Sequence, residues 1–133
     1  MDNPDIESLL QKYQSELLED IKIDELNLKD KAMMIPVIKH KWVARQMSHK
    51  SQRKKLEVVK KKLIIDFTSN TPVALTKNAI EQASINNPKI AAIHEKIEDL
   101  DIVIEYLEKV EKTLSSLTFD CKNVIDLQKL ETT

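Results

Sequence analysis

The chain contains no glycine, and this absence restricts the folds that are open to it. Glycine supplies the positive φ angles of tight hairpin turns and lets the backbone approach a phosphate closely. A glycine-free chain therefore disfavours a β-rich fold with many hairpins. It also lacks the P-loop and the G-x-G-x-x-G fingerprint of nucleotide-binding enzymes. Because apolar residues also recur at helical spacing, the sequence predicts an all-α fold.

Prolines and polar turn residues divide the 133 residues into helical segments, which we assign to a single domain over residues 1–133. A first helix follows Pro4, and residues 20–27 form a connection. Pro36 either begins or kinks a long middle helix, because proline lacks the N–H that a helix interior requires. The middle helix is expected over about 28–67 and is followed by a loop at Thr68–Pro72. A short helix is expected near Val73–Ile85, capped by Thr71 or Thr76. The C-terminal helix is expected over about 88–131, with its start at Asn86-Asn87-Pro88.

The C-terminal helix carries a wide apolar stripe in a heptad pattern over roughly 40 residues, or about 60 Å. A domain of this size does not cover so long a stripe by itself, so we predict that the helix assembles a homo-oligomer. The alternative is an antiparallel bundle within one chain. The predicted oligomerisation residues are Ile93, Ile97, Leu100, Ile104, Leu107, Leu114 and Leu117.

Positive charge is concentrated in the middle helix. Residues 31–62 hold eleven Lys and Arg and one acid, Glu57, whereas the segments on either side are both acidic. A long cationic block in an acidic helical protein is typical of a surface that binds a polyanion or an acidic partner. Two other interpretations stay open: the block could be a solvated face, or it could neutralise the chain's own acids.

Several of these cations share one helix face. At 100° per residue, Lys50, Arg53, Lys54, Lys60 and Lys61 fall within about 120°, and Leu56, Val59 and Leu63 lie roughly opposite. If the ligand is a nucleic acid, single strands are favoured over sequence-specific binding to a duplex, because no signature of a sequence-specific DNA-binding motif is present. The predicted DNA-binding residues are Lys50, Arg53, Lys54, Lys55, Lys60, Lys61 and Lys62.

Trp42 lies on the same helix, where its ring could stack on a base. Its apolar neighbours Ile38 and Val43 favour the other interpretation, in which it anchors the core.

No catalytic or metal site is predicted. His40, His49 and His94 are scattered without an H-E-x-x-H context, and the carboxylates near the C-terminus resemble the solvated side of an amphipathic helix. Cys121 is the only cysteine and occupies a core position of the heptad pattern, so it behaves as a small apolar residue in a reducing compartment. With no signal peptide and no apolar run of membrane-spanning length, we expect a soluble cytoplasmic protein that needs no cofactor.

The order of features resembles the UvsY recombination mediators of T4-like phages over about residues 8–131. The resembling segments are Glu19–Asp24, Lys41-Trp42, Leu56-Glu57-x-x-Lys60-Lys61 and the apolar C-terminal helix that contains Cys121. Some relatives have a glycine-rich loop where this chain has Thr-Ser-Asn-Thr-Pro. The resemblance implies that Lys60, Lys61 and Lys62 of this chain are the closest match to the family's basic cluster.

The resemblance implies an all-helical, non-enzymatic protein that forms a ring-like homo-oligomer, a hexamer or heptamer, through its C-terminal region. It implies binding to single-stranded DNA in the cytoplasm of the infected host. It also implies that the protein loads a RecA-like recombinase (UvsX) onto DNA covered by the phage single-stranded-DNA-binding protein. The competing hypothesis is a coiled-coil adaptor whose basic helix docks on an acidic protein.

Overall fold

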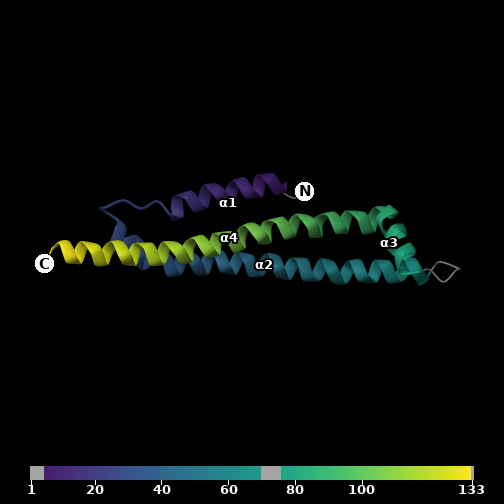
Figure 1. Cartoon of the computed structure of the whole chain (residues 1–133). Helices are drawn as coiled ribbons and strands as arrows, with labels where there is room; N and C mark the ends of the chain where they lie inside the picture. Colours follow the sequence, from purple (N-terminus) through teal and green to yellow (C-terminus); the bar gives the residue numbers. More distant parts are fainter. Residues whose placement is uncertain (1–4, 70–75, 133) are drawn as a thin grey trace. The chain divides into compact units, whose positions relative to one another are not determined.

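The computed structural model describes residues 5–69 and 76–132, with the side chains of residues 83 and 84 excepted, and these residues form an all-α fold. Four helices follow one another along this part of the chain (Figure 1). They are α1 (Ile6–Asp20), α2 (Leu28–Ser69), α3 (Lys77–Asn86) and α4 (Pro88–Glu131). The predicted fold class is confirmed.

The helix starts are capped by the residue types that favour such positions. The Asp5 carboxylate accepts a hydrogen bond from the N–H of Glu7 at the start of α1. Thr76 Oγ1 accepts from the N–H of Ala79 at 3.2 Å, so Thr76 caps α3, and Thr71, the other expected cap, lies outside the described residues. Asn87 Oδ1 accepts from the N–H of Lys89 at 3.0 Å immediately before Pro88. These bonds satisfy N–H groups that have no partner within the helix.

The middle helix begins at Leu28 and continues through Pro36, so the proline does not mark its start. The last two described residues of α2 are Thr68 and Ser69, whose hydroxyls donate to the carbonyls of Ile65 and Asp66 at 3.0 and 3.1 Å. These bonds occupy last-turn carbonyls that would otherwise lack a partner. The remaining positions of the predicted loop, 70–72, lie outside the described residues.

The sequence predicts one domain, and the structure groups the residues into two compact units. Unit 1 is the described part of Met1–Met47 and Glu105–Thr133, and unit 2 is the described part of Ser48–Ile104. Unit 1 therefore contains α1 with the first part of α2 and the last part of α4. Unit 2 contains the rest of α2, α3 and the first part of α4.

The core of unit 1 lies between the start of α2 and the end of α4. Leu28 and Ile35 of α2 form a buried cluster with Cys121 of α4, and Ile23, Ala32, Leu117 and Ile125 pack against it. Residues early in α2 thus meet residues late in α4, which makes the two segments antiparallel (Figure 1). Burial raises the pKa of the Cys121 thiol, as expected for a cysteine that acts as a small apolar residue.

Unit 2 has the same antiparallel pairing of α2 with α4. Arg53 of α2 pairs with Asp101 of α4, and Lys60 contacts His94, so positions that rise along α2 meet positions that fall along α4. The buried apolar residues of this unit all come from α4; they are Ile90, Ile97, Val103 and Ile104.

The heptad row of α4 is largely covered within the chain itself, contrary to the expectation that a domain of this size leaves it uncovered, and its role as the oligomer interface stays a prediction. Leu107 and Leu114 have no exposed surface, and Ile97 and Ile104 are buried. The other three predicted interface residues, Ile93, Leu100 and Leu117, are half-buried. The physical reason is that α2 is almost as long as α4 and supplies an antiparallel partner in each unit. The alternative of an antiparallel bundle within one chain therefore describes these residues.

Candidate nucleic-acid interface

Trp42 lies at the centre of the contact between α1 and α2 in unit 1. Its side chain has no exposed surface. Its ring makes an edge-to-face contact with Tyr13, with centroids 5.6 Å apart and planes at 79°. Its indole N–H donates to Asp20 Oδ2 at 2.8 Å, which satisfies the polar group of a buried ring. Base stacking on Trp42 would require these contacts to be given up, so the structure favours the core interpretation of this residue.

Lys41 and Arg45, two cations of the basic block at residues 31–62, lie against this aromatic pair. Lys41 Nζ lies 2.6 Å from Asp20 Oδ2 and 3.5 Å from Glu16 Oε1. Arg45 forms a two-pronged pair with the Glu16 carboxylate, with Nη2 at 2.9 Å from Oε1. The Arg45 guanidinium also lies 4.8 Å from the Trp42 ring centroid and 5.3 Å from that of Tyr13, within cation–π range. Lys41 and Arg45 therefore attach α1 to α2.

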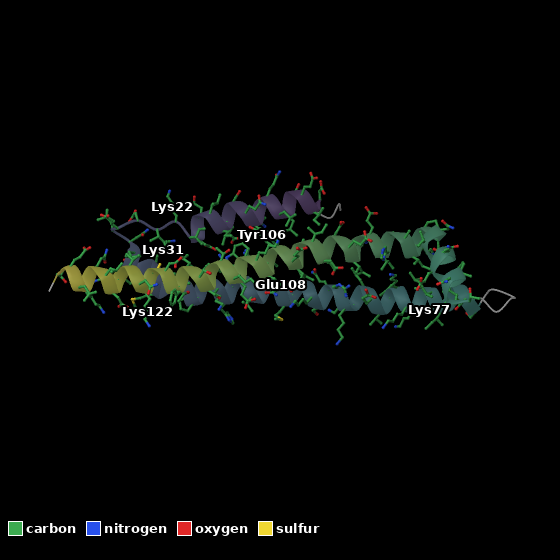
Figure 2. All side chains as sticks on the ribbon, viewed as in Figure 1. Lys22, Lys31, Lys77, Tyr106, Glu108 and Lys122 are labelled. Carbon is green, nitrogen blue, oxygen red and sulfur yellow. The ribbon has the colours of Figure 1, made fainter. Side chains whose placement is uncertain are left out.

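Lys31, the first cation of the block, caps the end of α1. Its Nζ lies 3.5 Å from the carbonyl oxygen of Glu19 and 3.4 Å from that of Asp20 (Figure 2 labels Lys31). A cation at this end satisfies carbonyls of the last turn and complements the helix dipole. Three cations of the basic block, Lys31, Lys41 and Arg45, are thus paired with acids or backbone carbonyls of α1.

The Glu16–Arg45 pair predicts a pH dependence for the stability of unit 1. The hydrogen bond from Arg45 lowers the pKa of Glu16, although burial acts in the opposite direction. A lowered native pKa stabilises the fold fully above the unfolded pKa of about 4.3, and this contribution disappears as the pH falls through the native value. We expect Glu16→Gln to cost about 1 kcal/mol at pH 7 and progressively less below about pH 4.3.

Urea unfolding followed by circular dichroism between pH 7 and pH 3 measures this effect. Glu19→Gln is the matched control, because the Glu19 side chain is exposed on the same helix and should change stability little at any pH. If the free energies of unfolding of the wild type and Glu16→Gln differ by the same amount at every pH in this range, the stabilising role assigned to the ionised Glu16–Arg45 pair is contradicted.

In unit 2, Arg53 and Lys60 of α2 contact α4. Arg53 pairs with the Asp101 carboxylate, with Nη2 3.4 Å from Oδ2, and lies 3.6 Å from Glu57; the hydrogen bond with Asp101 raises the pKa of Arg53. Lys60 Nζ lies 3.0 Å from His94 Nδ1, and His94 Nε2 lies 2.8 Å from Glu98 Oε1. A neutral imidazole that carries its proton on Nε2 satisfies both contacts of His94.

The other five predicted DNA-binding residues lie on the outward side of α2 in unit 2. At 100° per residue they occupy an arc of about 140° that contains no acid, because Glu57 and Asp66 fall outside it. Within the described residues, Lys54, Lys55, Lys61 and Lys62 form no ion pair. The exposed lysine face of α2 consists of Lys50, Lys54, Lys55, Lys61 and Lys62, all of them exposed.

The predicted site is thus divided. The structure brings the five lysines onto one solvated face and turns Arg53 and Lys60 toward α4. Glu16, Asp20 and Asp101, which pair with cations of α2, were not among the residues predicted from the sequence. The spacing of Glu16 and Asp20, one turn apart on a helix, was a usable signal for a cation-binding edge. No local signal identified Asp101, which lies 48 positions from Arg53.

Neither a metal cluster nor a membrane helix occurs in the part of the chain that the structure describes. Over residues 5–69 and 76–132, no three His, Cys, Asp or Glu side chains gather as ligands for a metal ion. None of the helices in these ranges combines the length and the apolar character that crossing a membrane requires.

The fold and the lysine face define an all-helical protein with a cationic surface suited to a polyanion. A sequence model of the family described as "Recombination, repair and ssDNA binding protein UvsY" matches residues 16–133. The chain belongs to the UvsY family, which confirms the resemblance seen in the sequence. Membership gives it a general role in recombination and single-stranded DNA binding.

Solved structures of the recombination mediator protein UvsY of bacteriophage T4 share this fold. The lattice type IV crystal structure has a TM-score of 0.79 at 18% identity, over 92% of this chain and 98% of that chain. The type II structure has a TM-score of 0.79 at 19% identity, over 93% and 98%. The type I structure has a TM-score of 0.75 at 19% identity, over 89% and 97%. No curated protein matches the chain in sequence.

Proposed function

We propose that this protein is a recombination mediator that binds single-stranded DNA through the exposed lysine face of α2. On DNA covered by a single-stranded-DNA-binding protein, it would promote loading of a RecA-like recombinase of the UvsX type. The proposed site of action is the cytoplasm of an infected bacterial host. The observation that carries the proposal is the acid-free arc of five exposed lysines in unit 2.

The lysine face supports contact with the phosphate backbone rather than with base edges. Lysine acts on phosphate as a compact point charge, whereas paired recognition of base edges relies on the fork of arginine. The chain has two arginines, Arg45 and Arg53, and both are paired with carboxylates within their own unit. Binding is therefore expected to tolerate any sequence and to weaken steeply with salt.

Assembly into a ring of copies, a hexamer or heptamer, would multiply weak contacts of this kind. The support comes from a second apolar surface near the end of α4, where Phe119, Val124 and Leu127 are 65%, 44% and 59% exposed. Viewed down the helix, Phe119 and Leu127 lie about 80° apart and roughly opposite the buried Leu114. We name Phe119, Val124 and Leu127 the outer α4 surface and propose it as the oligomer interface in place of the buried heptad row.

In the proposed mechanism, a ring holds one DNA strand at several points. Several lysine faces in one ring would hold neighbouring stretches of backbone and compete with the covering protein for phosphates. DNA released from that protein would then be available where the recombinase nucleates.

Removal of two lysines from the exposed lysine face should change the salt dependence of DNA binding. We expect Lys54→Gln with Lys61→Gln to reduce the slope of log K against log salt by about 1.4 and to weaken binding roughly 25-fold at 0.1 M salt. The measurement is fluorescence anisotropy of a labelled poly-dT oligonucleotide at several salt concentrations.

The matched control is Lys12→Gln with Lys122→Gln, which removes the same charge from exposed positions in unit 1 and should leave the slope nearly unchanged. Equal slopes for the two double variants would contradict the assignment of the lysine face. A further assay follows recombinase assembly on DNA already covered by the single-stranded-DNA-binding protein. The wild type should shorten the lag, and the Lys54/Lys61 variant should not.

Failure of the wild type to bind poly-dT at low salt would refute the proposal. The alternative, an adaptor whose basic helix docks on an acidic protein, would then account for the lysine face. An acidic polypeptide such as polyglutamate should in that case bind the wild type and lose affinity for the Lys54/Lys61 variant.

A further inference from the structure

Two apolar side chains lie within the exposed lysine face of α2. Val58 is 47% exposed and Ile65 is 63% exposed, although both belong to unit 2, where α2 has α4 as a packing partner. They are two helical turns apart and fall within about 20° of one another viewed down the helix axis. We name Val58 and Ile65 the apolar row.

Lysines flank the apolar row on both sides. Lys54 and Lys61 lie about 30–50° away on one side, and Lys55 and Lys62 lie about 50–70° away on the other. All four lysines are exposed. A ligand that reaches this row must therefore be anionic along its edges and apolar between them.

We infer that the apolar row contacts the faces of unstacked bases while the flanking lysines hold the phosphates of the same strand. This inference rests on the proposed function. A single strand has both chemistries along its length, and its base faces are available because they are not paired in a duplex. Burial of apolar surface against a base is favourable and does not depend on salt.

The charge pattern argues against a second copy of the same face as the occupant. Self-association through the apolar row would bring the lysines of one copy against those of the other, and like charges at close range repel. An anionic strand instead neutralises the lysines on both sides of the row. The structure thus assigns the row a role in preferring strands that carry bases over a bare phosphate backbone.

The test compares a poly-dT oligonucleotide with an abasic strand of the same length, which has the same phosphates and no bases. We expect the wild type to bind poly-dT roughly tenfold more tightly than the abasic strand. Val58→Ala with Ile65→Ala should remove most of this preference and leave the salt slope unchanged. Alanine has a higher helix propensity than valine or isoleucine, so these exposed substitutions preserve the helix.

The matched control is Val59→Ala. Val59 is 43% exposed, nearly as much as Val58, but it points about 100° away from it and outside the lysine face. It should keep the wild-type preference, and so should Val58→Leu with Ile65→Leu, because that variant restores apolar surface. Circular dichroism of every variant verifies its helicity.

An unchanged preference for poly-dT in the Val58/Ile65 alanine variant would overturn the inference while leaving the lysine-face proposal intact. A reduced salt slope in that variant would also overturn it, because the row would then act through the lysines. Lower affinity of the variant for phosphatidylserine vesicles, with unchanged affinity for DNA, would assign the row to a lipid surface instead. A wild type that binds neither oligonucleotide would refute the proposed function itself.

Discussion

Replacing Trp42 with alanine should lower the free energy of unfolding of unit 1 by about 3–5 kcal/mol. The side chain is fully buried, so its removal leaves a cavity between α1 and α2. The substitution also removes the edge-to-face contact with Tyr13 and the hydrogen bond to Asp20. Arg45 loses one of the two rings that its guanidinium faces. Urea unfolding followed by the far-ultraviolet circular dichroism signal measures the change.

Two comparison variants separate the parts of this effect. Trp42→Phe keeps an aromatic ring and removes the N–H donor, and since Lys41 still contacts the same Asp20 oxygen, we expect a smaller loss of about 1–2 kcal/mol. Met33→Ala changes a residue of the same helix that is 78% exposed, and it should shift stability by less than about 0.5 kcal/mol. Equal unfolding midpoints for Trp42→Ala and Met33→Ala would refute the assignment of Trp42 to the core.

The second large effect concerns assembly. Phe119→Glu with Leu127→Glu should prevent assembly of the proposed ring and leave monomers, because both carboxylates would be buried without partners at the proposed interface. The loss of multivalency should weaken binding to long poly-dT by roughly 10²- to 10⁴-fold. Sedimentation velocity gives the mass of the assembly, and anisotropy gives the affinity.

Surface substitutions are the appropriate test here because α4 also supplies the interior of each unit. Truncation of α4 would remove Leu107 and Leu114, which have no exposed surface, and would unfold the chain for reasons unrelated to assembly. Ser115→Glu with Gln128→Glu adds the same charge at exposed positions outside the outer α4 surface and should leave the assembly intact. If the Phe119/Leu127 variant keeps the wild-type mass, the interface lies elsewhere.

The helical organisation could be predicted from the sequence because it depends on local signals. The absence of glycine, the Asn-Pro start of α4 and the threonine before α3 act within a turn of where they lie. The start of α2 was expected near residue 28, where the structure has it, but Pro36 by itself did not locate it. Proline is tolerated near the beginning of a helix, and the actual start depends on the Asp24–Asn27 turn, in which Asp24 Oδ1 accepts from the N–H groups of Leu26 and Asn27.

The packing of α4 could not be predicted from its own pattern. An apolar heptad row fits a partner helix from the same chain as well as one from another copy. The inward side of α2 carries the apolar residues Ile35 and Trp42 in unit 1. In unit 2 the corresponding positions are Arg53 and Lys60, so the apolar pattern of the helix does not continue there. The polar inward positions are satisfied by Asp101 and His94, which are 48 and 34 positions away in the sequence. For the same reason, a charge count over α2 did not separate cations that hold the fold from those that face solvent.

The difference between the cations that are paired within the fold and those of the exposed lysine face has a consequence for how this surface can change over evolutionary time. Arg45 and Arg53 each need a particular carboxylate, Glu16 or Asp101, so a change at either position requires a compensating change elsewhere. A lysine on the outward arc needs only to remain within reach of a phosphate. The lysines can therefore shift by a turn or exchange places among descendants without loss of the surface. The positions proposed to face DNA are then free to change, whereas the arginine positions remain constrained by their carboxylate partners.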